Sequence, residues 1–112
     1  MNTENNKIIA VFMGLSYCEK YQFEGWYKNH EHNERVYDLN YDFDWNWLME
    51  VVEKIESLGF WTEFRTHKNV YRFVIGDYDF ETKPTVNIAS KLKIEAIYNA
   101  CFEFVKWYNQ QN

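Results

Sequence analysis

The strongest constraint on the fold is the stretch DWNWLMEVVEKIESLGF at positions 44–60. Its apolar residues recur every three to four positions, which is the period of one helix face and not of a strand. The members of this stripe are Leu48, Val51, Val52, Ile55 and Leu58. Asp44 has a side chain preferred at a helix N-cap, and Gly59 stands where a residue in the left-handed region ends a helix. The stretch therefore predicts an amphipathic helix whose apolar face the rest of the chain must cover.

Two further helices are predicted towards the ends of the chain. Residues 91–108 repeat apolar side chains at helical spacing, and Ser90 is a suitable N-cap for that helix. Residues 7–13 form a shorter helical candidate, for which a strand is the alternative because the run is so short. The polar ends, residues 1–6 and 109–112, are expected to be frayed.

Strands are predicted between the helices. Residues 70–75, VYRFVI, are rich in β-branched and aromatic side chains and should pair with residues 60–65, FWTEFR, in an antiparallel hairpin. Turns are expected at residues 66–69 and 76–77. A third, edge strand is expected at residues 78–81, followed by a connector at residues 85–89 for which an extended conformation is an alternative.

Residues 15–43 have an irregular pattern in which only short extended segments can be recognised. The candidates are residues 23–27 and 36–39, separated by the polar sequence KNHEHNER, which is typical of a hairpin tip. Amphipathic helices interspersed with strands predict an α+β fold, with the helices packed on a small, mainly antiparallel β-sheet. The length, 112 residues, corresponds to a single domain spanning 1–112.

The aromatic content is the most informative feature of the composition. Aromatic residues make up 21% of the chain, with five Trp, nine Tyr and nine Phe. A domain of this size cannot easily bury so many large rings, so some must lie at the surface. Clustered exposed aromatic side chains usually mark an interface, and this surplus therefore favours a binding protein.

The net charge and the two cysteines indicate which kinds of partner, site and cellular compartment to expect. The formal net charge is −5, which favours a partner with a basic surface and argues against direct binding of nucleic acid. Cys18 and Cys101 have no zinc or redox spacing. No signal peptide and no segment long enough to cross a membrane is recognisable, so a reduced, cytoplasmic protein is expected.

Two polar clusters are candidates for chemistry. His30, Glu31 and His32 form the densest group of metal-competent side chains, but they lack the spacing of a zinc motif and a third ligand. Asp77, Asp79 and Glu81 alternate along the predicted edge strand. No catalytic triad or glycine-rich phosphate loop is recognisable. The sequence therefore predicts no enzymatic activity, no metal and no cofactor, with a small metal-dependent hydrolase as an alternative.

Three blocks of the sequence resemble a group of small phage and prophage proteins, some of which carry a phage α-β-α sandwich domain. The blocks are IIAVFMGL at residues 8–15, residues 45–60, and SKLKIEAIYNACFEFVKWYN at residues 90–109. Together they cover under half of the chain. The aromatic-rich middle, residues 17–41, departs from the usual pattern of these proteins and is therefore where this chain is expected to be specialised.

The resemblance implies an accessory protein that binds and inhibits a host defence component in the host cytoplasm. By analogy, the expected target is an RNA-guided CRISPR effector nuclease, with type VI-B favoured, bound with or without its guide RNA. The expected contact residues in the middle region are Trp26, Tyr27, His30, Glu31, Tyr37 and Asp38. The acidic residues Asp77, Asp79 and Glu81 form a second candidate surface. A self-associating phage structural or regulatory protein is a further alternative.

Overall fold

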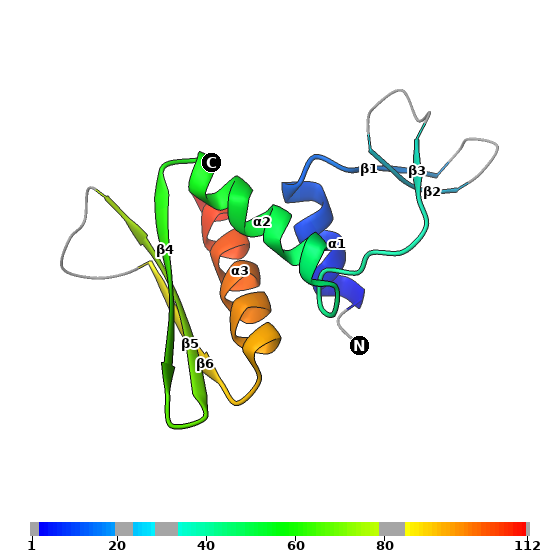
Figure 1. The fold of residues 1–112 in the computed structure, drawn as a ribbon. Coiled ribbons are helices and arrows are strands. Elements are labelled where there is room, and N and C mark those ends of the chain that lie inside the picture. The colour runs from blue at the N-terminus through cyan, green and yellow to red at the C-terminus, as the bar shows by residue number, and fades with distance from the viewer. Residues whose placement is uncertain (1–2, 20–23, 29–33, 79–84, 112) are drawn as a thin grey trace.

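The computed structural model describes residues 3–19, 24–28, 34–78 and 85–111. Within these ranges the chain forms three helices and two three-stranded antiparallel sheets (Figure 1). The helices are α1 (Thr3–Phe12), α2 (Trp45–Ser57) and α3 (Lys93–Gln110). The small sheet contains β1 (Ser16–Cys18), β2 (Gly25–Tyr27) and β3 (Arg35–Val36). The large sheet contains β4 (Phe60–His67), β5 (Val70–Asp77) and β6 (Val86–Ser90). The predicted α+β class is confirmed, with two sheets in place of one.

Helix α2 forms as the sequence predicts. The Asp44 carboxylate accepts hydrogen bonds from the backbone N–H groups of Asn46, at 2.9 Å, and Trp47, at 3.4 Å. These bonds satisfy two of the donors that the first turn of a helix leaves without a partner. Gly59 follows the helix with φ +97°, the left-handed conformation expected there. Of the predicted stripe, Leu48, Val51, Val52 and Ile55 are buried, whereas Leu58 is the C-cap residue, beyond the last helical turn, and is 38% exposed.

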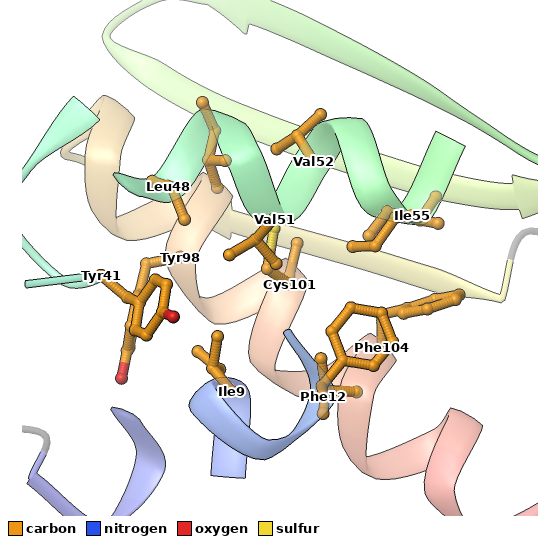
Figure 2. Packing of buried hydrophobic residues seen from close by; sticks show 14 of the residues in the cluster. Ile9, Phe12, Tyr41, Leu48, Val51, Val52, Ile55, Tyr98, Cys101 and Phe104 are labelled. Carbon is orange, nitrogen blue, oxygen red and sulfur yellow. The ribbon is translucent and has the colours of Figure 1, made fainter. Parts of the chain in front are cut away.

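Helix α3 lies at the centre of the molecule. It covers one face of the large sheet and also packs against α1 and α2 (Figure 1). Ala96, Ala100 and Cys101 are fully buried in it, and such small side chains let neighbouring elements approach closely. Figure 2 shows Val51 of α2 and Ile9 of α1 pointing towards Cys101. The core therefore forms around α3, with α2 as one of the elements that cover it.

The aromatic residues of the core meet at the far end of α3. The Phe104 ring makes edge-on contacts with Phe12 of α1, at 6.2 Å between centroids, and with Phe60 of β4, at 4.8 Å. Trp107 and Tyr108, on the next turn of α3, lie against the same rings. Edge-on and offset ring pairs of this kind add to the stability gained from burying their area. This cluster ties α1, α3 and the large sheet together.

The hairpin of β4 and β5 is confirmed but is longer than predicted. Its turn consists of Lys68 and Asn69 alone, whose φ angles of 46° and 66° are those of a type I′ turn. The turn expected at residues 76–77 is wrong, because Gly76 pairs with Trp61 inside the hairpin. A methyl group on Gly76 would lie 2.1 Å from Cζ2 of Trp61, so glycine there makes room for the indole ring. The third strand is β6, formed by residues expected to be a connector, whereas the strand predicted at residues 78–81 falls largely outside the described residues.

The ends of the outer helices differ from the sequence-based expectation. Ser90 does not cap α3, because its backbone pairs with Tyr71 in the sheet and the helix begins only at Lys93. The Ser90 hydroxyl instead accepts a hydrogen bond from the N–H of Leu92, at 3.3 Å. Residues 3–6, expected to be frayed, form the first turn of α1, and α3 continues to Gln110. Asn6 explains the early start of α1, because its side chain is buried and bonded to distant parts of the chain.

Two further findings bear on the chemistry of the chain. Cys18 and Cys101 are both buried and have free thiols. No helix among the described residues is long and apolar enough to cross a membrane.

Candidate functional site

The small sheet places Trp26 beside α1, where its half-buried ring packs against the edge of the main core. Side chains alternate along β2, so Trp26 and the buried Tyr27 point to opposite faces of the sheet. Trp26 pairs with Tyr17 of β1 across the sheet, and their rings lie 5.2 Å apart with an interplanar angle of 59°. Neither ring is fully covered. The pair therefore forms an aromatic surface held by the backbone of the sheet.

One side of this surface meets the outer face of α1. A hollow of about 420 Å³ lies between them, lined by Glu4, Lys7, Ile8, Val11, Tyr17 and Trp26. Val11 is 63% exposed although it lies in an apolar helical segment. The Lys7 ammonium forms an ion pair with Glu4 at 3.2 Å, which places charge at the rim. The hollow thus has an apolar wall and a charged rim, as a protein-binding groove does.

The other side of Trp26 opens into a second hollow, of about 530 Å³, between α1 and the segment that leads into α2. Its lining includes Lys7 and Trp26 again, and also Thr3, Asn6, Tyr37, Asp38, Leu39, Asn40, Asp42 and Phe43. Tyr37 is 79% exposed and Phe43 is 64% exposed. The two hollows share Trp26 and Lys7, and we call them together the Trp26 groove.

Short interactions fix the small sheet that carries this groove. The Tyr17 hydroxyl donates to Oε1 of Glu24 at 2.6 Å, and this bond to a carboxylate raises the pKa of Tyr17. The Arg35 guanidinium donates to the backbone oxygen of Glu24 at 2.7 Å and lies 5.0 Å from the ring centroid of Tyr37. Tyr37 is therefore held by a cation–π contact on one face while the rest of its ring remains accessible.

The structure brings three of the predicted contact residues together and separates others. Trp26, Tyr37 and Asp38 all line the Trp26 groove. Tyr27 lies on the opposite face of β2 from Trp26 and is 5% exposed, so its side chain does not line the groove. Asp77 lies on the large sheet, paired with Phe60. His30, Glu31, Asp79 and Glu81 lie outside the described residues, as does His32 of the proposed metal cluster.

Sequence reasoning missed the contribution of α1 to the groove. The helix predicted at residues 7–13 contains four apolar residues, Ile8, Ile9, Val11 and Phe12, and the sequence alone did not assign any of them to the core or to the surface. The structure buries Ile9 and Phe12 and leaves Ile8 and Val11 exposed. The signal was weak, because the four positions span about 160° of the helix circumference, which is somewhat wider than a buried stripe of about 100° but can still face one core. Only the fold assigns Ile8 and Val11 to a second, outward-facing surface.

The described residues offer no alternative site of metal chemistry. Among them, no three His, Cys, Asp or Glu side chains are close enough together to hold a metal ion. The comparisons with known proteins supply no relative: no protein-family model, no curated protein and no solved structure matches this chain. The resemblance to phage proteins remains a prediction, and the function must be argued from the groove itself.

Proposed function

We propose that this chain is a binding protein that inhibits a host defence nuclease by docking the Trp26 groove onto it. The observation that carries the proposal is an aromatic groove, formed by α1 and the small sheet, that the described part of the chain leaves uncovered. Trp and Tyr are the residues most enriched among those that dominate binding energy at protein interfaces. Tyr37, with most of its ring accessible, is the anchor that we expect to contribute most.

The charge at the rim of the groove supports a basic partner. Glu4, Asp38 and Asp42 line it, whereas Lys7 is its only lysine or arginine among the lining residues described. A protein that binds RNA must itself carry a basic surface to neutralise phosphates. An acidic rim around an aromatic centre is complementary to such a surface and would favour association with it.

The finer assignment rests on the resemblance to phage proteins. It names an RNA-guided CRISPR effector, with type VI-B preferred, as the nuclease to test first. Fold or family likeness alone does not establish function, so the target has to be identified by binding. The first experiment is a pull-down with the tagged chain from lysate that contains CRISPR effectors, with bound protein and RNA both identified.

The decisive experiment compares two exposed tyrosines in binding to the recovered nuclease. Tyr37→Ala removes the proposed anchor, and Tyr78→Ala, at a residue 69% exposed outside the groove, is the matched control. We expect Tyr37→Ala to weaken binding by about 30-fold, the effect of losing an interface hot spot, and Tyr78→Ala to change it by less than about twofold. Equal effects of the two variants would refute docking through the groove. Recovery of the chain alone, as a defined oligomer in light scattering, would instead favour self-association.

A further inference from the structure

The positive charges of this acidic chain are unevenly distributed. Of its 12 Lys and Arg residues, five lie at one end of the large sheet: Arg65, Lys68, Arg72, Lys91 and Lys93. Figure 1 shows the turn between β4 and β5 and the connection from β6 to α3 at this same end. In the same elements, Glu63 lies two positions before Arg65 and Glu95 two positions after Lys93. We call these five cations, with His67, the basic hairpin end.

The two arginines of the basic hairpin end are placed side by side. Arg65 and Arg72 are direct partners in the register of β4 and β5, so their side chains leave the sheet on the same face. Like charges directly opposite one another destabilise a sheet. Arg65 donates to Oε2 of Glu63 at 2.8 and 2.5 Å, and Arg72 donates to Oδ1 of Asn87 at 2.7 Å. These bonds orient both guanidinium groups, and among the described residues only Arg65 has a carboxylate partner.

The arginines line a hollow whose described lining residues, apart from Val70, are arginine, lysine or histidine. Its volume is about 420 Å³, and it is lined by Arg65, His67, Lys68, Val70 and Arg72. An anion placed there would relieve the repulsion between the arginines. Arginine presents a planar set of donors that matches phosphate oxygens, so a phosphate group is the anion that this geometry fits best.

An exposed and a half-buried aromatic ring lie together on the other face of the same end. Phe64 and Tyr71 are stacked with their centroids 6.0 Å apart and an interplanar angle of 13°, and Phe64 is 40% exposed. The Lys93 ammonium lies 5.5 Å from the centroid of the Tyr71 ring. Cations that follow a phosphate backbone, combined with rings on which bases stack, are the features by which proteins bind single-stranded nucleic acid. An acidic peptide would use the cations and leave the rings without a role.

We propose that the basic hairpin end binds single-stranded nucleic acid, with its cations on the phosphates and the Phe64–Tyr71 pair stacking against a base. The net charge of −5 led to the opposite expectation, but affinity for phosphates depends on where the cations lie and not on their sum. This inference does not rest on the proposed function. It concerns a different surface and is tested on the purified chain without any nuclease.

The test is a fluorescence-anisotropy titration with labelled oligouridine and oligothymidine of equal length. Contact with about four phosphates gives a slope of about −2.8 in log affinity against log salt, which is a loss of about 50-fold between 50 and 200 mM salt. Arg65→Gln/Arg72→Gln should weaken binding at least about tenfold and reduce the slope by about 1.4. The RNA and DNA arms show whether the 2′-hydroxyl contributes.

The matched control is Lys28→Gln/Lys106→Gln. It changes the net charge equally but removes two exposed lysines, ion-paired with Glu34 and Glu103, outside the basic hairpin end. We expect less than about a twofold effect. Tyr71→Leu should weaken binding while leaving the salt slope unchanged, because stacking involves no counterion. If the arginine variant loses its helical circular dichroism, Lys68→Gln/Lys91→Gln tests the same surface without touching the sheet pairing.

Three results would overturn the inference. The first is no binding of either oligonucleotide at 50 mM salt, and the second is an equal loss in the control variant. The third is competition by polyglutamate as effective as by RNA of equal charge, which would assign the basic hairpin end to an acidic protein. None of these results affects the Trp26 groove, and failure to bind a nuclease would leave the oligonucleotide result unchanged.

Discussion

Replacing Asn6 with alanine should reveal how the first helix is fixed to the rest of the chain. The side chain is 5% exposed and makes three long-range hydrogen bonds. Its Nδ2 donates to the backbone oxygen of Leu39 at 2.9 Å and to Oδ1 of Asp42 at 3.0 Å, and its Oδ1 accepts from the Tyr98 hydroxyl at 2.7 Å. One amide therefore joins α1, the segment before α2, and α3.

The loss in free energy of unfolding caused by Asn6→Ala can be estimated from what happens to each of these three hydrogen-bond partners. The Tyr98 hydroxyl is buried and would lose its acceptor, at about 1–3 kcal/mol. The bonds to Leu39 and Asp42 are only partly buried, so water can replace the amide and each loss costs about 0.5–1 kcal/mol. The sum is about 3 kcal/mol, a large share of the stability of a small domain. Alanine also favours the helix slightly more than asparagine does, which offsets a small part of this.

Asn5→Ala is the matched control. It changes the same residue type on the same helix, at a described side chain with no recorded hydrogen bond, and carries the same gain in helix propensity. Urea unfolding followed by circular dichroism compares the two variants. With a slope of about 1.5 kcal/mol per molar urea, the midpoint for Asn6→Ala should fall by about 2 M, whereas Asn5→Ala should move it by less than about 0.4 M.

A double-mutant cycle tests the bond to Tyr98 itself. Tyr98→Phe alone should cost about 1–2 kcal/mol, because it leaves Oδ1 of Asn6 without its donor. In the Asn6→Ala background it should cost much less, giving a coupling energy of about 1 kcal/mol or more. Additive effects of the two substitutions, or equal midpoints for Asn5→Ala and Asn6→Ala, would refute this account of how α1 is held.

Two further predictions concern the core and the large sheet. Gly76→Ala should lower the free energy of unfolding by about 1–3 kcal/mol, because the methyl group would lie 2.1 Å from Trp61 Cζ2. Thermal unfolding should show a much smaller cost of the same substitution in a Trp61→Ala background. An equal cost in that background would contradict the steric explanation. Burial raises the pKa of the Cys101 thiol, so above about pH 8.5 the unfolded chain loses a proton that the folded chain keeps, and stability must fall as pH rises. Urea unfolding should show a loss of about 1.2 kcal/mol between pH 8 and 9.5 that is absent in Cys101→Ala, and identical pH profiles would be inconsistent with it.

The elements that the sequence predicted well are those whose signals lie within the element itself. Helix α2 contains its own N-cap, Asp44, and is followed by its own stop signal, Gly59. The β4–β5 hairpin contains β-branched and aromatic strands on both sides of a short polar turn. In both cases, side chains close in sequence supply the partners that the backbone needs, so no knowledge of the tertiary structure was required.

The elements that were predicted poorly depend on distant partners. Ser90 has the side chain of a helix cap, but pairing with Tyr71 uses it as the last residue of a strand. The first turn of α1 is stable because Asn6 bonds to residues 33 to 92 positions away. Neither partner can be recognised from the local sequence. For the same reason, the sequence indicated α2 as the central helix, whereas in the structure α3 is the helix that the large sheet, α1 and α2 all contact.

The candidate surfaces also contain some residues that the sequence predicted and others that only the fold brings together. The aromatic surplus correctly indicated rings at the surface, and Trp26 and Tyr37 were selected because they lie in the unusual middle region. Their neighbours Ile8 and Val11 come from another element, which only the fold brings to the same groove. The basic hairpin end was missed because its cations are scattered between residues 65 and 93 and were counted only within the net charge.

The distance between the two proposed surfaces limits which single partner could contact both of them. The Trp26 groove, of which α1 is one wall, and the basic hairpin end lie on opposite sides of α2 and α3, in a molecule 49 Å long (Figure 1). No small ligand can reach both, so a single partner that does must be large and must offer two different chemistries. A ribonucleoprotein does so, because it presents a basic protein surface and an accessible RNA strand. The Asn6 bonds would then matter for binding as well as stability, because they hold α1, one wall of the groove, at a fixed distance from the sheet that carries the cations.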